Sequence, residues 1–194
     1  SPVLKNCQFH ASTYHGYGIQ DFLQVDARFA SDPRAARENP QLAEDELRAL
    51  VDEAHARGIY VILDIVLNHA GDVFEYVLRD AGSAEADWQD SPYTIRWRDE
   101  NGRGRTYWSA PPNQPARDAA VWPAELQRNE LFRRQGRGAE AGGDFASLKE
   151  LVTGLRETTE ADGRHYAVRK ALIRAYQYLI AKYDVDGFRI DTLK

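Results

Sequence analysis

Apolar residues return with the period of a helix in one stretch of the first third of the chain. They occupy positions i, i+3, i+4 and i+7 of one face, namely Leu47, Leu50, Val51 and Ala54. This spacing predicts an amphipathic helix that ends near Gly58, a residue suited to the position just after a helix. Residues 59–67 follow as a nearly continuous apolar run in which Val and Ile dominate. Because polar residues do not alternate with apolar ones, we expect a strand buried on both faces, as in a parallel sheet.

A second helix and strand are predicted far downstream. Apolar residues mark one face of a helix over residues 165–183, namely Val168, Leu172, Tyr176, Leu179, Ile180 and Tyr183. Asp184 follows that face, and residues 185–191 are typical of another strand. A helix followed by a buried strand, found twice, predicts an α/β fold.

The connection between these two units is far longer than the few residues that α/β folds normally use. It covers residues 71–163 and contains four tryptophans, Trp88, Trp97, Trp108 and Trp122. We therefore expect three parts: residues 1–70, a small inserted domain at 71–163, and residues 164–194.

Composition narrows the set of partners. The chain has 194 residues and a net charge of −5, so neither nucleic acid nor an anionic membrane is expected. The Arg/Gly-rich residues 133–143 are interpreted as a mobile loop, since the aromatic residues that RNA binding would use are not interleaved there. The single Cys7 leaves redox compartment and localisation open. The chain contains no Met, and we interpret both ends as cuts through a larger protein.

Charged residues stand inside the two predicted strands, where an unpaired charge is costly. Arg189 and Asp191 share one strand face because side chains alternate. Asp64 interrupts the first apolar run, and Asn68 and His69 follow at its C-terminal end. We interpret Asp64, Arg189 and Asp191 as one polar cluster, in which Asp64 taken alone is best explained as a structural partner of the arginine.

Asp191 differs from Asp64 in its position along the strand. It lies at the C-terminal end, where parallel α/β folds place their ligand sites. A carboxylate with a fixed cation beside it suits a nucleophile. The sequence therefore favours a catalytic role for Asp191.

Three segments together resemble the α-amylase family of glycoside hydrolases. Residues 64–69 (DIVLNH) and 187–194 (GFRIDTLK) look like two signatures of that family. Residues 14–30 (YHGYGIQDFLQVDARFA) look like the stretch after its second barrel strand. They occur in the order and spacing of the family. The resemblance implies an α/β fold that is a partial (β/α)8 TIM barrel, about strands 2–4, with an inserted domain B in the loop after barrel strand 3.

The resemblance also implies roles for individual residues. Asp191 matches the catalytic nucleophile, and Arg189 matches the arginine that hydrogen-bonds it. His69 matches a histidine that contacts the sugar at the cleavage point, and Tyr17 matches an aromatic residue that stacks on that sugar. The alternatives are a satisfied histidine at a strand end and an ordinary packed tyrosine.

Further positions match supporting residues of the family. Asp64 matches an aspartate near the arginine, and Lys194 matches a residue of the neighbouring acceptor region. Asn68 matches a calcium ligand, but Ser147 stands where calcium-binding members carry an aspartate, and one amide cannot replace a set of several oxygens. The ammonium group of Lys149 could supply the charge of the cation. We expect neither bound calcium nor another cofactor.

The implied activity is a retaining cleavage of α-glucosidic bonds in starch-like glucans or malto-oligosaccharides. The acid/base Glu of the family lies beyond Lys194, so we expect this chain alone to be poorly stable and inactive. The alternatives are a transglycosylase or isomerase of the same family, or a non-catalytic sugar-binding or transport-associated relative. An α/β enzyme with a phosphate site is disfavoured because no Gly-rich strand-to-helix loop is present. The tryptophans could be sugar platforms, but core packing is the expected role for most of them.

Overall fold

The computed structural model describes residues 1–9, 14–79, 82–105, 116–138, 142–155 and 166–191. The helices in these ranges are α1 (Pro33–Glu38), α2 (Gln41–Ala56) and α3 (Ala167–Tyr183). The strands are β1 (Leu4–Asn6), β2 (Ile19–Val25), β3 (Ile62–Val66), β4 (His69–Ala70), β5 (Phe74–Val77), β6 (Gly82–Ser83), β7 (Ile95–Arg98), β8 (Gly104–Arg105), β9 (Lys149–Glu150) and β10 (Gly187–Asp191). Short 3₁₀ turns cover Ala27–Phe29, Ala124–Leu126 and Asn129–Leu131.

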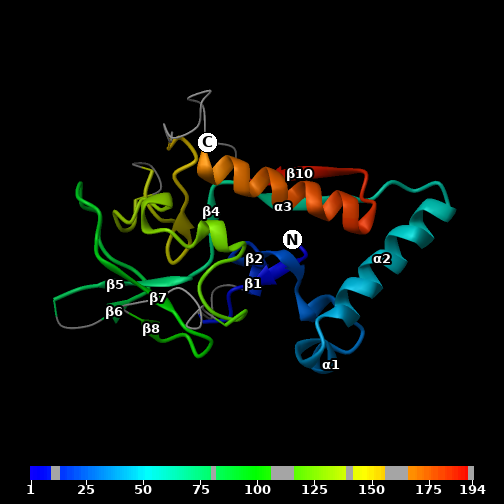
Figure 1. The fold of residues 1–194 in the computed structure, drawn as a ribbon, viewed down its shortest axis with the longest axis horizontal. Coiled ribbons are helices and arrows are strands. Elements are labelled where there is room, and N and C mark those ends of the chain that lie inside the picture. The colour runs from blue at the N-terminus through cyan, green and yellow to red at the C-terminus, as the bar shows by residue number, and fades with distance from the viewer. Residues whose placement is uncertain (10–13, 80–81, 106–115, 139–141, 156–165, 192–194) are drawn as a thin grey trace.

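The predicted parallel strand pair is β3 with β10. Residues 62–66 pair in register with residues 187–191. Figure 1 shows α3 running beside β10 along one side of the molecule. The buried Tyr176 of α3 donates its hydroxyl to the carbonyl of Val66 at 2.6 Å. Its ring also packs against Phe188, with 5.5 Å between centroids, so α3 fixes both strands at once.

Both predicted helices are confirmed, and their ends follow from backbone conformation. α2 stops at Ala56, and Gly58 then adopts a φ of +72°, which glycine reaches without strain. α3 ends in Asp184, whose φ of 56° lies in the left-handed region. Asp is one of the residues that tolerates this region, so the chain can turn there directly into β10.

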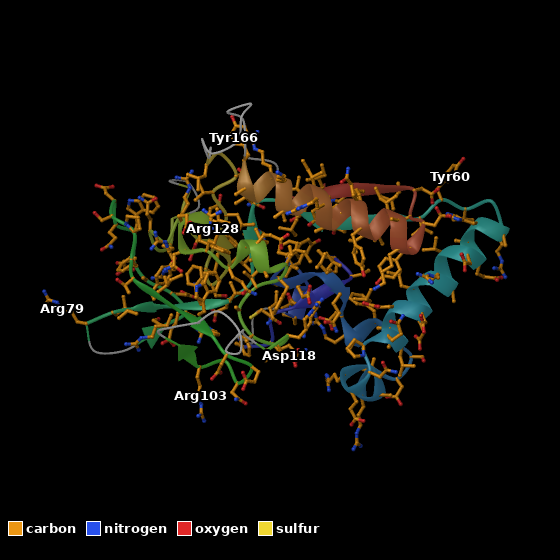
Figure 2. The ribbon with its side chains drawn as sticks, in the orientation of Figure 1. Tyr60, Arg79, Arg103, Asp118, Arg128 and Tyr166 are labelled. Carbon is orange, nitrogen blue, oxygen red and sulfur yellow. The ribbon has the colours of Figure 1, made fainter. Side chains whose placement is uncertain are left out.

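The prediction of a strand buried on both faces from residue 59 onwards is wrong in part. β3 begins only at Ile62, and Ile59, Tyr60 and Ile62 are 55%, 81% and 63% exposed. Figure 2 shows Tyr60 projecting from the surface. The reason is that, within the described ranges, β10 is the only strand paired with β3. The interior residues Leu63 and Ile65 are buried as expected.

The long connection (residues 71–163) carries a four-stranded antiparallel sheet of order β6-β5-β7-β8. Figure 1 shows this sheet at the opposite end of the molecule from α2. Its core is aromatic: the ring of Phe74 lies edge-on to those of Tyr76, Trp97 and Phe132, with centroids 5.4–5.6 Å apart. Edge-to-face pairs of this kind add about 0.5–1.5 kcal/mol each to the burial of their area.

The tryptophans of the long connection differ in exposure. Trp97 is a core residue at 6% exposure, and Trp122 donates its indole N–H to the carbonyl of Ala119 at 3.1 Å. Trp88 is 36% exposed. Trp108 lies outside the described residues. Core packing is therefore confirmed for Trp97.

The long connection is tied to the first part of the chain by backbone hydrogen bonds. The Trp122 carbonyl accepts from Phe22, and the Trp122 N–H donates to the carbonyl of Gln20, at 3.0 and 2.8 Å. Buried apolar residues of both parts belong to one connected core. The division of the chain into three parts stays a prediction. No described helix combines the length and apolarity that a bilayer span needs.

An ion pair joins the end of α2 to the turn before β10. His55 Nε2 lies 2.9 Å from Asp186 Oδ2, which also accepts the N–H of Val61 at 2.7 Å. The hydrogen bond to Asp186 raises the pKa of His55 above its ordinary value. A raised pKa in the folded state stabilises the fold below the ordinary pKa of about 6.5, and this contribution disappears as pH rises through the folded-state pKa.

We predict that His55→Gln removes the stabilisation that the His55–Asp186 pair provides at low pH. The stability of the variant should therefore depend less on pH above 6.5 than that of the parent chain. The measurement is the urea midpoint at pH 6 and pH 8 for the parent chain and the variant. The parent should lose more stability than the variant between these pH values. An equal loss in both chains would show that the His55–Asp186 pair does not contribute.

Candidate active site

One arginine joins two carboxylates at the β3–β10 pair. The register places Arg189 opposite Asp64. Arg189 Nη1 donates to Asp64 Oδ1 at 2.9 Å and to Asp191 Oδ1 at 2.6 Å. The polar cluster that alternation and charge indicated is therefore present in the structure.

The cluster is partly open to solvent. The side chains of Asp64 and Asp191 are 15% and 24% exposed, and that of Arg189 is 58% exposed. Partial burial acts to raise the pKa of Asp64, but hydrogen bonds from Arg189 and Tyr17 outweigh it and lower the pKa below the ordinary range. The same bonds to Asp64 and Asp191 raise the pKa of Arg189. The cluster therefore keeps its arginine charged and Asp64 ionised at neutral pH.

Tyr17 and His69 extend the cluster by hydrogen bonds. The Tyr17 hydroxyl donates to Asp64 Oδ2 at 3.0 Å, and this bond raises the pKa of the phenol. His69 Nε2 lies 3.0 Å from the carbonyl oxygen of Tyr17. Because a carbonyl only accepts, Nε2 must carry the hydrogen. His69 thus holds the backbone of the residue whose hydroxyl holds Asp64.

The ring of His69 lies in the interior beside Asn68. Its ring is buried, at 6% exposure, and its Nδ1 lies 3.1 Å from Asn68 Oδ1. Contact of His69 or Tyr17 with a sugar stays a prediction. Lys194 lies outside the described residues.

A second charged cluster lies in the long connection and is more deeply buried. The side chain of Lys149 is 0% exposed, and its Nζ lies 3.5 Å from Asp144 Oδ2 and 3.7 Å from Asp72 Oδ1. It lies over the rings of Phe74 and Tyr76, 4.9 and 4.4 Å from their centroids. Burial lowers the pKa of Lys149 and raises that of Asp144. The cation is thus held by two carboxylates and two aromatic faces.

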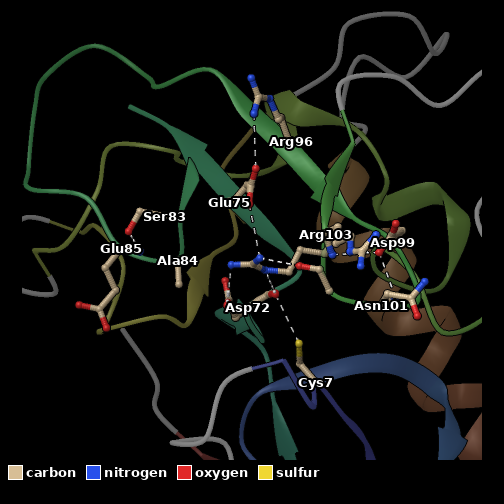
Figure 3. Close-up of polar contacts among 12 residues, drawn as sticks. Cys7, Asp72, Glu75, Ser83, Ala84, Glu85, Arg96, Asp99, Asn101 and Arg103 are labelled. Atoms are coloured by element: carbon tan, nitrogen blue, oxygen red, sulfur yellow. Dashed lines mark hydrogen bonds and ion pairs between the residues drawn. The ribbon is translucent and has the colours of Figure 1, made fainter. Parts of the chain in front are cut away.

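Arg98 extends this cluster through two carboxylates, those of Asp72 and Glu75, which Figure 3 labels. Its guanidinium lies 3.0 Å from Asp72 Oδ2 and 3.6 Å from Glu75 Oε2. The thiol of the buried Cys7 donates to the Asp72 carbonyl at 3.4 Å. The carboxylate partners of Lys149, Asp72 and Asp144, were not predicted from the sequence. The available signal was Asp72 and Glu75 flanking the apolar pair Val73-Phe74.

The residues compared with calcium ligands do not fit such a site. Ser147 is buried and brings a hydroxyl where a carboxylate would be needed, and the buried ammonium of Lys149 follows two residues later. Asn68 offers one amide oxygen, which already faces His69. Within the described residues, no three His, Cys, Asp or Glu side chains gather as a metal site would require. The expectation that no calcium binds stays a prediction.

Comparison with known proteins identifies the class. The model of the alpha amylase catalytic domain matches residues 1–194. An alpha-amylase of Streptomyces lividans is 29% identical over all of this chain and 21% of its own length. The periplasmic alpha-amylase of Escherichia coli K12 is 29% identical over 93% of this chain and 28% of its own length.

A solved structure extends the likeness to the fold. The crystal structure of gamma-CGTase from Alkalophilic Bacillus clarkii aligns with all of this chain and 22% of that one, at a TM-score of 0.53 and 20% identity. The chain belongs to the alpha-amylase catalytic-domain family and has the α/β architecture of part of its barrel. It spans less than a third of the length of the curated relatives described above.

We predict that Lys149→Met destabilises the chain by about 3–5 kcal/mol, because two buried carboxylates lose their shared cation. The measurement is urea unfolding at pH 7. The matched control is Lys170→Met at an exposed position of α3, where a change within about 0.5 kcal/mol is expected. A Lys149→Met chain as stable as the control would contradict this role of the ammonium group.

Proposed function

We propose that the protein carrying this chain is a retaining glycoside hydrolase acting on α-glucosidic bonds of starch-like glucans or malto-oligosaccharides. The observation that carries the proposal is the Arg189 bridge between Asp64 and Asp191 at the carboxyl end of a parallel strand pair. Family membership supplies the bond type. Binding of nucleic acid or membrane is not part of the proposal.

Asp191 is the nucleophile in this proposal. Its Oδ1 is held by Arg189 while the side chain stays 24% exposed, so a sugar ring can approach the carboxylate. A carboxylate placed below the ring stabilises an oxocarbenium-like transition state and then bonds to the anomeric carbon. Arg189 fixes the direction of that carboxylate.

Asp64 supports the nucleophile and cannot act as the acid. A general acid needs a raised pKa, whereas the pKa of Asp64 is lowered. Both of its oxygens are also occupied, one by Arg189 and the other by Tyr17. We therefore propose that the acid/base carboxyl group comes from outside residues 1–194.

The finer assignments follow the same proposal. Residues 1–3 mark the end of barrel strand 2, β3 is barrel strand 3, and β10 is barrel strand 4. Residues 71–163 form domain B between residues 1–70 and 164–194. Tyr17 and His69 shape the sugar-binding wall, with Lys194 in the acceptor region. No calcium takes part, since a buried ammonium lies in the segment where its carboxylate ligand would be.

Two other kinds of function can be distinguished from hydrolysis by experiment. A transglycosylase or isomerase would use the same nucleophile, and the ratio of water-derived to sugar-derived products separates it from a hydrolase. A non-catalytic sugar-binding relative would not need Asp191 and Arg189 in a bonded pair, which is why hydrolysis is favoured.

Removal of the nucleophile tests the proposal. In the protein carrying this chain, Asp191→Ala should lower kcat on maltoheptaose at least about a thousandfold. Azide should restore turnover of α-glucosyl fluoride: it attacks the anomeric carbon from the side that Asp191 vacates, the C–F bond breaks, fluoride leaves and β-glucosyl azide forms. Asp52→Asn on the exposed face of α2 is the matched control. An α-configured azide product would exclude Asp191 as the nucleophile.

The 194-residue chain alone should show no saturable hydrolysis of maltoheptaose. The reason is that Asp64 is held by Arg189 and Tyr17 and has a lowered pKa, while Asp191 serves as the nucleophile in this proposal. The measurement is release of reducing ends over a day at micromolar protein. Saturable turnover that disappears in the Asp191→Ala chain would overturn the proposed location of the acid.

A further inference from the structure

A polar groove lies apart from the candidate active site. It has a volume of about 390 Å³, which is within the range of small-ligand sites. One wall comes from β1, β2 and α1, and the other comes from the long connection through Glu100, Arg117 and Asp118. Figure 2 shows Asp118 on the side of the long connection that faces α1. None of its lining residues belongs to the Arg189 cluster.

A buried amide without a partner lies in the groove wall. Gln20 lines the groove and is only 3% exposed. Its Nε2 has no hydrogen-bond partner. A buried donor left unsatisfied costs about 1–3 kcal/mol, and few are found in native proteins. The terminal amide torsion is soft, so a modest rotation can turn this donor towards a ligand.

The inner charges of the groove are already neutralised. Lys5 pairs with Asp118, and Arg117 Nε donates to Asp21 Oδ2 at 2.6 Å. Asp26 Oδ2 pairs with Arg28 at 3.0 Å. An ionic ligand held by Lys5, Arg117 or Asp26 would therefore have to break pairs that the protein has made. A neutral ligand with many hydroxyl groups would not.

The remaining polar lining consists of three side-chain amides and the charged residues Arg37, Glu38 and Glu100. Gln8 and Gln24 line the groove together with Gln20, and Phe9 adds an aromatic ring. A side-chain amide offers both a donor and an acceptor, which is what a hydroxyl group needs. An aromatic ring offers a flat apolar surface for the C–H groups of a sugar ring.

We propose that this groove binds a neutral oligosaccharide outside the catalytic cluster, with Gln20 donating to a sugar hydroxyl. The chemistry of the groove specifies the hydroxyl-rich, uncharged ligand. That the sugar is an α-glucan rests on the proposed function. An accessory groove of this kind would hold a long glucan at a second point while one of its bonds lies at Asp191.

The test is a titration of the protein carrying this chain, with Asp191→Ala, so that binding is separated from turnover. Maltopentaose and cellopentaose are added in turn while the side-chain amide signal of Gln20 is followed by NMR. Gln20→Leu identifies that signal and should weaken binding about 3- to 10-fold, the worth of one hydrogen bond. Gln177→Leu, at an exposed position of α3, is the matched control.

Stability separates a binding role from a structural one. Because the amide is unsatisfied, Gln20→Leu should leave the urea midpoint unchanged or raise it. If Gln20→Leu does not fold, Gln24→Ala on the same strand gives the binding readout. A Gln20 signal that neither sugar moves at millimolar concentration overturns the proposal, as does movement by inorganic phosphate instead. Movement by cellopentaose alone supports the groove and counts against the α-glucan specificity of the proposed function.

Discussion

The parallel pairing of β3 with β10 is the constraint on which the candidate site depends. The two strands are brought together across more than a hundred residues, and only their register decides that Arg189 lies opposite Asp64. Shifting a strand by one residue would turn its side chains to the other face. The register is fixed less by the exposed ion pairs, which contribute little in solvent, than by α3. Tyr176 binds one strand through its hydroxyl and the other through its ring.

The long connection acts on the same site through its buried cation. Lys149 belongs to β9, and β9 pairs with β4, where His69 lies opposite Glu150 and Ala70 opposite Lys149. His69 in turn holds Tyr17, whose hydroxyl holds Asp64. A continuous series of contacts therefore runs from a buried ammonium to the carboxylate beside the candidate nucleophile. Buried ion pairs add little net stability, but they penalise any arrangement that separates the charges. In this chain the penalty keeps Lys149 of β9 beside its carboxylates, and β9 in turn holds its paired strand β4 in place.

The elements predictable from the sequence are those with a regular period and local causes. The apolar face of α2, the apolar face of α3 and the αL residue after each helix depend on neighbours within a few positions. The cluster of Asp64, Arg189 and Asp191 was predictable because charges in apolar strands must find partners. The exposure of Ile62 could not be predicted from the sequence, because it depends on which strands lie beside β3.

The short strands of the long connection escaped prediction for a related reason. β6, β8 and β9 each contain two residues, too few to show alternation. Their positions depend on contacts between residues far apart in sequence, such as Lys149 with Asp72. Only the resemblance to calcium-binding relatives pointed to Lys149. Its carboxylate partners could not be identified from the spacing of residues along the sequence.

Polar groups in this chain fall into two kinds, and the difference bears on where a ligand can act. Lys149, Asp72 and Arg98 neutralise one another's charges in the interior, so they fix geometry and offer little to a ligand. Asp191 and Gln20 differ: the first keeps a quarter of its side chain open, and the second has an amide nitrogen without a partner. A folded chain can keep a partly exposed carboxylate or an amide donor without a partner, at a cost in stability. In the two proposals, a bound sugar approaches the carboxylate of Asp191 and accepts a hydrogen bond from the amide of Gln20.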